Sequence, residues 1–506
     1  MARCSAAGGL SLGFTHDSLQ LTRAFLDGGR PSAEQAHGLM ARLISEGNSA
    51  RERELCLAFS RIIQNRLACG QPLQRLVQRL QRCQPIHVLF INDNGVYAGA
   101  GIALGRQAEA FALQGHSVTI VALNSDLQEV RHCLSEFSLA CRRKHLHVTC
   151  VHGADGLQTD ASGQLDLREA VDRFLPPSGQ PTLVVLGNLH AVAVSPAFIC
   201  ELLARQCVVA MYAHDPDWVT GGCAYPQYHA CSRYLTGCSD EDCPKPAAMY
   251  PQTSAGMISQ NYLLREVLMH LPGLLLFTNS SWSSDRFRER YPWRAAIPVL
   301  LGLDTSIFRP DPAVRVRIRR SHGIDPEAFV IAVGADSLSR PGKGGAIVER
   351  LARALERHRE IVFLSFGHAS LEVGNIIKLG YSHLSQDVAA AFQAADVFFN
   401  PATIESFGQT AIEASACGCP TLALRGSGLD DAVEHGVTGL LLDHEQEFQP
   451  VLLDLMHNPE ALQALSRRAV ERSAQRFSLQ QQYVRWIQAL TLHSADPQPE
   501  APPEPF

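Results

Sequence analysis

Short apolar runs alternate with helical patterns through most of this chain. Each run is three to six residues long, as expected of a short buried strand, and is followed by apolar positions spaced three or four residues apart. The runs form two series. The first lies at His87–Ile91, Val118–Leu123, Leu146–Val151, Thr182–Leu186, Val208–Tyr212 and Leu274–Thr278. The second lies at Phe329–Val333, Ile361–Phe366, Ile376–Leu379, Val397–Asn400, Thr421–Leu424 and Leu440–Leu442.

Helical patterns fill the intervals between the strands. They are clearest at Ala103–Leu113, Ile347–Leu355, Val388–Ala394 and Thr410–Ala416. Alternating strands and helices predict a parallel sheet with helices on both faces, so two series predict two doubly wound, Rossmann-like α/β domains. Open parallel sheets bind ligands beyond the carboxyl ends of their strands, and we therefore expect the site in a cleft that both domains face.

Composition and proline positions suggest the domain limits. We expect a helical N-terminal extension at 1–84, a first α/β domain at 85–305 and a second at 306–475. A C-terminal helix at 476–493 is expected to pack back on the first domain. The Pro- and Glu-rich tail at 494–506 is expected to be disordered.

Bulk composition excludes several classes of protein. The 506 residues are 46% hydrophobic and 19% charged, with a formal charge of −6, which suits a folded protein and gives no sign of nucleic-acid binding. Residues 1–10 lack a secretory signal pattern, and no run approaches the ~18 apolar residues of a membrane span. Most of the 15 cysteines are scattered singly. A cytoplasmic protein with at most peripheral membrane contact is expected.

A glycine-rich segment follows the first strand. Gly99, Gly101 and Gly105 form G-x-G-x-x-x-G, but Gly99 lies well beyond the strand end, unlike the early glycines of a dinucleotide-binding fingerprint. Such a loop before a helix suits an anion. A close helix–sheet contact that requires glycine explains the pattern equally well.

The segment from Pro401 to Cys419 carries the most informative chemistry. A strand ends at Pro401 and a helix begins near Thr410, so the intervening amides could bind a phosphate at the helix N-terminus. Glu405 and Glu413 flank that start, and carboxylates accept hydrogen bonds from sugar and ribose hydroxyls. Alternatively, one glutamate favours the helix dipole and the other is merely solvated.

His214 and Asp215 end another predicted strand, with Asp217 and Trp218 after them. A histidine at a strand end beside a cleft is a common acid–base or metal-binding group. A hydrogen-bonded structural role is the alternative.

Four cysteines cluster in the loop 221–246. Cys223, Cys231, Cys238 and Cys243 have the spacing C-x(7)-C-x(6)-C-x(4)-C. In a reducing compartment, a structural zinc is more plausible than two disulfides. Four unligated thiols are the alternative.

Several segments resemble, in matching order, the retaining glycosyltransferases of family 4, which have the GT-B fold. Glu405 and Glu413 match the E-x(7)-E motif, and PGKGG resembles R-K-G. PVLLGLDTSIFRP resembles the interdomain link, with Leu301 where Asn is usual, and VEHGVTGLLL resembles the closing segment. HDPDWVTGGC resembles the H-D-x-W-x-x-T-G-G-C cysteine loop of polysaccharide-building members. The resemblance covers about residues 85 to 490.

This resemblance implies an acceptor-binding first domain and a donor-binding second domain. The implied catalytic residues are His214, Glu405 and Lys343, with Asp215 and Trp218 on the acceptor side. The implied donor-binding residues are Gly99, Gly101, Arg340, Lys343, Tyr381, Glu405, Phe407, Gly408, Gln409, Thr410 and Glu413. Many relatives place an Arg after the glycine equivalent to Gly334, where this chain has Ala335, so Arg340 is assigned that charge.

The implied activity is transfer of a hexosyl group, with retention, from a UDP- or GDP-sugar to a glycan, lipid-linked or protein acceptor. No catalytic cofactor and no nucleic acid are expected, and residues 1–84 are a candidate surface for a protein partner. Three alternatives stay open: a nucleotide-sugar epimerase of the same fold, an NAD(P)-dependent dehydrogenase with Asp126 as its ribose acid, and a non-catalytic scaffold.

Overall fold

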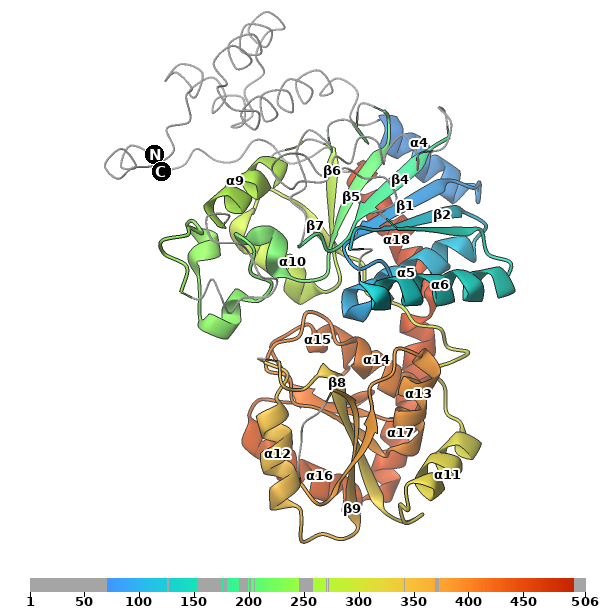
Figure 1. The fold of residues 1–506 in the computed structure, drawn as a ribbon, viewed down its shortest axis with the longest axis vertical. Helices are drawn as coiled ribbons and strands as arrows, with labels where there is room; N and C mark the ends of the chain where they lie inside the picture. The colour runs from blue at the N-terminus through green and yellow to red at the C-terminus, as the bar shows by residue number, and fades with distance from the viewer. Residues whose placement is uncertain are drawn as a thin grey trace, which may run out of the picture.

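The chain forms two α/β domains, which lie one above the other in Figure 1. The computed structural model describes residues 71–495 except 125–126, 153–174, 176–179, 191–198, 200–201, 204, 245–257, 270, 272, 341 and 369–372. Each domain contains one parallel sheet packed with helices, which confirms the expected doubly wound class. Among the described residues, no helix has the length and apolar composition to cross a bilayer. Most of the expected extension and of the expected tail lies outside these residues.

The first domain contains a seven-stranded sheet in the order β3-β2-β1-β4-β5-β6-β7. Its strands are β1 (His87–Asn92), β2 (Ser117–Ala122), β3 (Val148–His152), β4 (Thr182–Leu186), β5 (Val208–Ala213), β6 (Leu274–Thr278) and β7 (Ala296–Pro298). Its helices are α4 (Gln71–Gln81), α5 (Ala98–Ala112), α6 (Gln128–Arg143), α9 (Ile258–Met269) and α10 (Ser281–Arg290). Three short 3-10 helices, η1 (Pro216–Val219), η2 (Pro226–His229) and η3 (Arg233–Leu235), lie between β5 and α9.

The second domain contains a six-stranded sheet in the order β10-β9-β8-β11-β12-β13. Its strands are β8 (Phe329–Ser337), β9 (Ile361–His368), β10 (Ile376–Gly380), β11 (Val397–Asn400), β12 (Thr421–Leu424) and β13 (Gly439–Leu442). Its helices are α11 (Pro312–Ser321), α12 (Gly345–Ala354), α13 (Ser385–Ala394), α14 (Gln409–Ala416), α15 (Leu429–Ala432), α16 (Phe448–His457) and α17 (Pro459–Phe477), with the 3-10 helix η5 (Glu445–Glu447). In both sheets the strand order reverses at the centre, between β1 and β4 and between β8 and β11.

Every expected strand overlaps a strand of the structure, because central parallel strands are buried on both faces and form continuous apolar runs. The hydrophobic pattern does not predict β7, whose three residues are too few to show a period. It also starts α5 too late. The helix begins at Ala98, so Gly99 and Gly101 lie in its first turn instead of in a loop.

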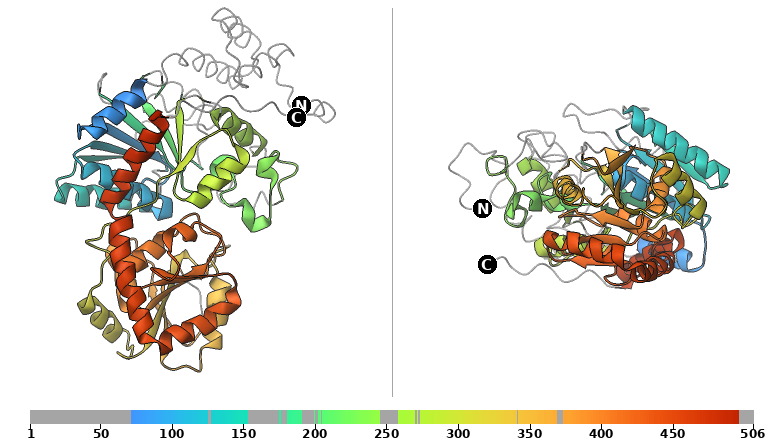
Figure 2. Two further views of the ribbon diagram at one scale, coloured as in Figure 1. Left: turned by 180° about the vertical axis from the view of Figure 1, so that it is seen from behind. Right: turned by 90° about the horizontal axis from the view of Figure 1, so that it is seen from below.

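The last helix, α18 (Leu479–Ala495), returns from the second domain to the first (Figure 2). It packs against α5 and α4, and its Trp486 side chain is fully buried. The Trp486 ring lies 5.9 Å from Phe111, 5.6 Å from Tyr212 and 4.9 Å from Phe277, between ring centroids. Burial of a large aromatic side chain therefore anchors helix α18 to the first domain.

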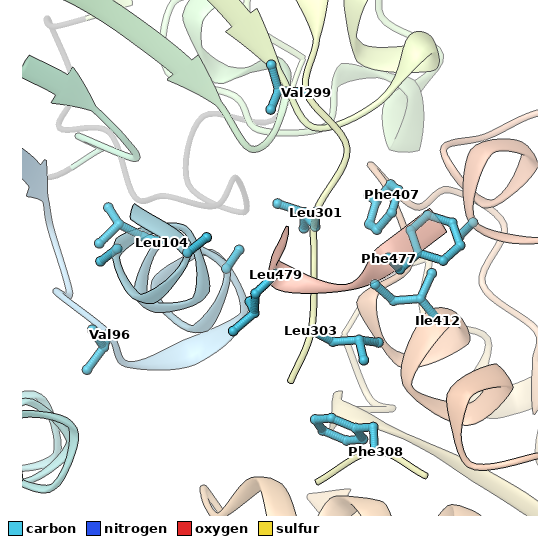
Figure 3. Packing of buried hydrophobic residues seen from close by; sticks show 14 of the residues in the cluster. Val96, Leu104, Val299, Leu301, Leu303, Phe308, Phe407, Ile412, Phe477 and Leu479 are labelled. Carbon is cyan, nitrogen blue, oxygen red and sulfur yellow. The ribbon is translucent and has the colours of Figure 1, made fainter. Parts of the chain in front are cut away.

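The two domains share an apolar junction where the chain crosses between them. The amide of Leu303 donates to the carbonyl of Phe477 at 2.7 Å, so the two crossing segments are hydrogen bonded. Figure 3 shows Leu301 and Leu303 between helix α5 on one side and Phe407 and Phe477 on the other. One continuous hydrophobic cluster includes all four of these side chains, so the two domains share part of their hydrophobic core.

Candidate functional site

A cavity of ≈ 440 Å³ lies between the carboxyl-end loops of the two sheets. This volume is within the roughly 300–1,000 Å³ of typical small-molecule sites. The first domain lines it with Asn92, Asp93, Asn94, Tyr97, Ala98, Gly99, Ala100, Gly101, Asn188, His190, His214, Asp215, Cys223, Tyr225, Tyr228, Asn279 and Leu301. The second lines it with Gly334, Ala335, Leu338, Arg340, Lys343, Asn400, Pro401, Glu405, Ser406, Phe407, Gly408, Gln409 and Thr410. Most of the expected site residues therefore meet in one place.

Lys343 and Glu405 form an ion pair in the wall of this cavity. The Lys343 ammonium lies 2.6 Å from Oε2 of Glu405, and both side chains are largely buried. Lys343 stands between Gly342 and Gly344, which both have φ of 76°. A Cβ on Gly344 would lie 2.4 Å from the carbonyl oxygen of Pro401, so glycine is required for the turn to approach the loop that carries Glu405.

Helix α14 begins at the cavity. Gly408, its N-cap residue, has φ of 96°, and Gln409 and Thr410 open the helix. The first amides of a helix have no partner within it, and together with the helix dipole they favour an anion. The Phe407 side chain is buried against Phe477 in the domain junction (Figure 3), so Phe407 is expected to contribute to the cavity mainly through its backbone.

Glu413 lies one turn deeper in α14 and does not line the cavity. Its side chain is buried, and its Oε1 accepts a hydrogen bond of 2.5 Å from Arg106 of α5. Burial raises the pKa of Glu413 and outweighs the charge of Arg106, which opposes the shift. Arg106 also donates to Oε1 of Gln409 at 3.3 Å, and Gln409 donates to the carbonyl of Gly99 at 2.7 Å. A chain of polar contacts thus crosses the domain boundary beside the cavity.

Arg106 is absent from the residues that sequence reasoning selected. The only local signal is a single cation in a helix of mostly small and apolar residues, and a solvated helix position explains that signal equally well. Its guanidinium lies over the Phe308 ring at 5.2 Å, and the residue is only 8% exposed. Burial shows that this arginine belongs to the interior.

His214 directly follows β5 and lines the cavity from the first domain, whereas Lys343 lines it from the second. It is buried, and its Nε2 has no hydrogen-bond partner among the described residues. Burial lowers the pKa of His214 to about 4, so its imidazole is neutral at pH 7. The side chain of Asn279 donates to the His214 carbonyl at 2.8 Å and fixes the strand end. A neutral imidazole with an unused ring nitrogen can bind a ligand hydroxyl.

Asp215 is engaged by a second histidine, His190, which sequence reasoning did not select. Nε2 of His190 lies 3.2 Å from Oδ2 of Asp215 and 3.8 Å from Oδ2 of Asp217. Burial opposes the charged imidazole, but the two carboxylates outweigh it and raise the pKa of His190 to about 9. At pH 7 His190 is therefore positively charged, whereas the neighbouring His214 is neutral. The available sequence signal was the position of His190 just beyond β4, at the carboxyl edge of the sheet.

Trp218 and Tyr381 lie outside the cavity. Trp218 is buried in the core of the first domain, with the guanidinium of Arg265 6.0 Å from its ring. Tyr381 is 37% exposed and stacks on His368, with ring centroids 4.4 Å apart. Arg340, by contrast, lies in the turn before Lys343 and lines the cavity.

The four clustered cysteines line one small hollow of ≈ 20 Å³ beside the cavity. Cys223 lines both the hollow and the cavity. Burial raises the pKa of Cys223 to about 12 and that of Cys238 to about 11. In the part of the chain that the structure describes, no group of three or more Cys, His, Asp or Glu side chains is arranged to hold a metal ion.

Part of the second domain is similar to known glycosyltransferases. Residues 368–472 match the family model for Glycosyl transferases group 1. The D-inositol 3-phosphate glycosyltransferase of Pseudarthrobacter chlorophenolicus is 32% identical over 190 residues, which are 34% of this chain and 44% of that protein. The enzyme of the same name from Saccharomonospora viridis is 34% identical over 200 residues, which are 35% of this chain and 45% of that protein. The chain thus spans less than half the length of these curated relatives.

Solved structures share the two-domain architecture over about four fifths of the chain. Anabaena HepE in complex with UDP and glucose has a TM-score of 0.57 at 18% identity, covering 80% of this chain and 99% of that one. Sucrose-phosphate synthase of Thermosynechococcus elongatus has a TM-score of 0.55 at 16% identity, covering 81% and 100%. The two-domain architecture is therefore the GT-B fold.

Proposed function

We propose that this protein is a retaining glycosyltransferase that moves a hexosyl group from a UDP- or GDP-sugar to a hydroxyl acceptor. The observation that carries the proposal is the Lys343–Glu405 pair beside the start of α14, in a cavity between two GT-B domains. The matching of residues 368–472 to Glycosyl transferases group 1 supports it, because that segment includes Glu405 and α14. The UDP complexes of HepE support a uridine nucleotide as the first donor to test.

In the proposed reaction, the donor diphosphate lies against the first amides of α14 with Lys343 as its cationic partner. Glu405 binds hydroxyls of the donor sugar. Glu413 is assigned to the ribose, which requires its carboxylate to reach the cavity from its present contact with Arg106. The acceptor oxygen forms a bond to the anomeric carbon on the face that the diphosphate leaves. The bond from that carbon to the diphosphate oxygen breaks, and a phosphate oxygen takes the acceptor proton. Lys343 and the helix amides stabilise the charge that develops on the leaving group.

His214 is proposed to orient the reacting sugar from the first domain. Its Nε2, which has no hydrogen-bond partner within the described part of the chain, and its low pKa suit a neutral hydrogen-bonding group, not a cation. The acceptor is proposed to enter from the first domain near Asp215. A glycan, a lipid-linked saccharide in polysaccharide biosynthesis, or a protein would each supply the hydroxyl, and the reaction is proposed to take place in the cytoplasm.

The test is a panel of UDP- and GDP-sugars, screened first for thermal stabilisation and then for nucleotide release with and without mixed saccharide acceptors. The proposal predicts acceptor-dependent release with one sugar class, and a product whose anomeric configuration by NMR equals that of the donor. An inverted product would refute retention. An epimerised nucleotide sugar formed without acceptor would identify an epimerase instead.

A structural zinc on Cys223, Cys231, Cys238 and Cys243 is a separate proposal. It is supported by four potential thiolate ligands around one hollow that has room for about one water-sized sphere. Zinc binding requires the four side chains to converge beyond their present arrangement. Metal analysis after purification without chelator should give one zinc per chain, and less in Cys238→Ser. Absence of zinc from the wild-type protein would refute this proposal without affecting the transferase.

A further inference from the structure

Two tyrosines from the cysteine loop reach across the cleft to the second domain. The hydroxyl of Tyr225 donates to Oγ of Ser406 at 3.3 Å, and that of Tyr228 donates to the carbonyl of Ile404 at 3.5 Å. Ile404 and Ser406 are the chain neighbours of Glu405. The first domain therefore touches the loop that carries the proposed sugar-binding carboxylate on both sides of it.

Tyr228 also packs on the turn that carries Lys343. A Cβ on Gly342 would lie 2.0 Å from a Tyr228 ring carbon, so the ring occupies the space that a side chain there would need. The rings of Tyr225 and Tyr228 are 5.2 Å apart between centroids and inclined by 33°. The pair forms one aromatic surface that contacts the chain neighbours of both Lys343 and Glu405.

This aromatic surface faces the cavity, which Tyr225 and Tyr228 both line. Burial and then the negative charge of Glu405 raise the pKa of both phenols, so each remains a neutral O–H group at physiological pH. Neutral hydroxyls can bind sugar hydroxyls, and aromatic faces cover apolar sugar faces.

Hydrogen bonds within the cysteine loop hold the segment that carries Tyr225 and Tyr228 in place. Oγ1 of Thr220 accepts a hydrogen bond from the amide of Cys223 at 2.8 Å and donates to the Cys223 carbonyl at 2.9 Å. Cys223 lies at the wall shared by the cysteine hollow and the cavity, two residues before Tyr225. The packed loop thus positions the tyrosine pair at the edge of the donor site.

We infer that Tyr225 and Tyr228 close the sugar end of the donor cleft, where they select the size of the donor sugar and exclude water from it. This inference rests on the proposed transferase function and deepens it. Tyr228 contributes ring volume, and Tyr225 contributes a hydroxyl beside Glu405. Loss of either should alter donor choice and the partition between transfer and hydrolysis.

The experiment compares Tyr228→Ala, Tyr228→Phe and Tyr225→Phe with the wild-type protein. For each variant, kcat/KM is measured with a hexose donor and with its bulkier N-acetylhexosamine counterpart, and hydrolysis is measured without acceptor. We expect Tyr228→Ala to shift the donor ratio about tenfold toward the bulkier sugar, in the range that pocket-volume changes produce. We expect its ratio of hydrolysis to transfer to rise several-fold. Tyr225→Phe should raise KM for the donor more than it lowers kcat.

Tyr234→Phe is the matched control. Tyr234 lies in the same loop and donates to Glu289 at 2.8 Å, but it does not line the cavity. Tyr228→Phe retains the ring and tests the inference if Tyr228→Ala fails to fold, because loss of the bond to Ile404 should still raise hydrolysis. Donor and hydrolysis ratios that match those of Tyr234→Phe in every variant would overturn the inference. Wild-type protein that turns over no donor would refute the transferase proposal itself, and the inference with it.

Discussion

The guanidinium of Arg106 and the carboxylate of Glu413 form a buried ion pair, 2.5 Å apart, that joins the two domains beside the cavity. Arg106 is on α5 of the first domain, and Glu413 is on α14 of the second. Their side chains are 9% and 7% exposed, so water screens the pair little. Glu413, the residue assigned to the donor ribose, is therefore held in place by the first domain. The geometry of the donor site thus depends on the distance between the two domains.

Breaking this pair should be costly on either side. We expect Arg106→Met or Glu413→Gln to lower the free energy of unfolding by about 3–5 kcal/mol, because each leaves an uncompensated or poorly bonded buried group. Arg106→Met with Glu413→Gln should lose clearly less than the sum of the single changes. Urea denaturation of the four proteins measures the coupling.

The exposed pair Arg353–Glu349, at 2.6 Å on α12, is the control for that cycle. Solvent screens such surface pairs, so changes at Arg353 and Glu349 should be close to additive. Strictly additive effects of Arg106 and Glu413 would show that their contact does not stabilise the fold.

Removing the Lys343 ammonium should abolish most turnover while the protein stays folded. We expect Lys343→Ala to lower kcat about 10²–10³-fold, the usual effect of losing one group that stabilises a developing anion. Glu405→Gln should mainly raise KM for the donor sugar. Steady-state kinetics with the best donor from the panel measures both.

Lys378→Ala is the matched change, because Lys378 is exposed on β10 and does not line the cavity. It should leave kcat unchanged. Wild-type kcat in Lys343→Ala would contradict the proposed role of the ion pair.

Acid should weaken the packing of helix α18 on the first domain. His116 accepts a hydrogen bond from the Ile86 amide at 3.2 Å and bonds the Tyr483 hydroxyl of α18 at 2.8 Å. Burial lowers the pKa of His116 to about 4, below the roughly 6.5 of an unfolded histidine. As pH falls between these values the unfolded chain binds the proton first, so the stability present above pH ~6.5 is lost toward pH ~4.

We expect that loss to reach about 2 kcal/mol of the free energy of unfolding, after allowance for partial solvation of the site. His116→Gln keeps an acceptor and a donor but does not titrate, so its stability should fall less over the same range. His358→Gln, at an exposed histidine, should behave as the wild type does. Identical pH profiles for His116→Gln and the wild type would exclude His116 as the source.

Trp486 should be the most important side chain of α18 for stability. Trp486→Ala removes a fully buried indole and should lower the free energy of unfolding by about 3–5 kcal/mol through lost burial and a residual cavity. Leu492→Ala, on the same helix but 58% exposed, should change it by less than about 0.5 kcal/mol. Equal effects of the two changes would show that α18 does not depend on this packing.

Local patterns predicted the elements well and the contacts between them poorly. Central strands such as β5 and β11 were predictable because burial on both faces demands uninterrupted apolar residues. Helix α5 was predicted to start too late, because its early glycines resemble a loop. A Cβ on Gly101 would lie 2.8–2.9 Å from the backbone of Gly95 and Val96, so close backbone packing accounts for that glycine.

The sequence alone determined the two α/β domains, the order of their strands along the chain and the proximity of Glu405 to a helix start, because periodicity, burial and turn chemistry act over a few residues. Only the tertiary structure decided that Arg106 meets Glu413, which is 307 positions away in the sequence, and that Tyr225 reaches Ser406. It also decided that His190 is protonated beside a neutral His214. The Arg106–Glu413 and Tyr225–Ser406 contacts depend on how the two sheets face each other, and the two histidines meet because β4 and β5 are neighbours in one sheet although they are apart in the sequence. No repeating pattern within either domain encodes that arrangement.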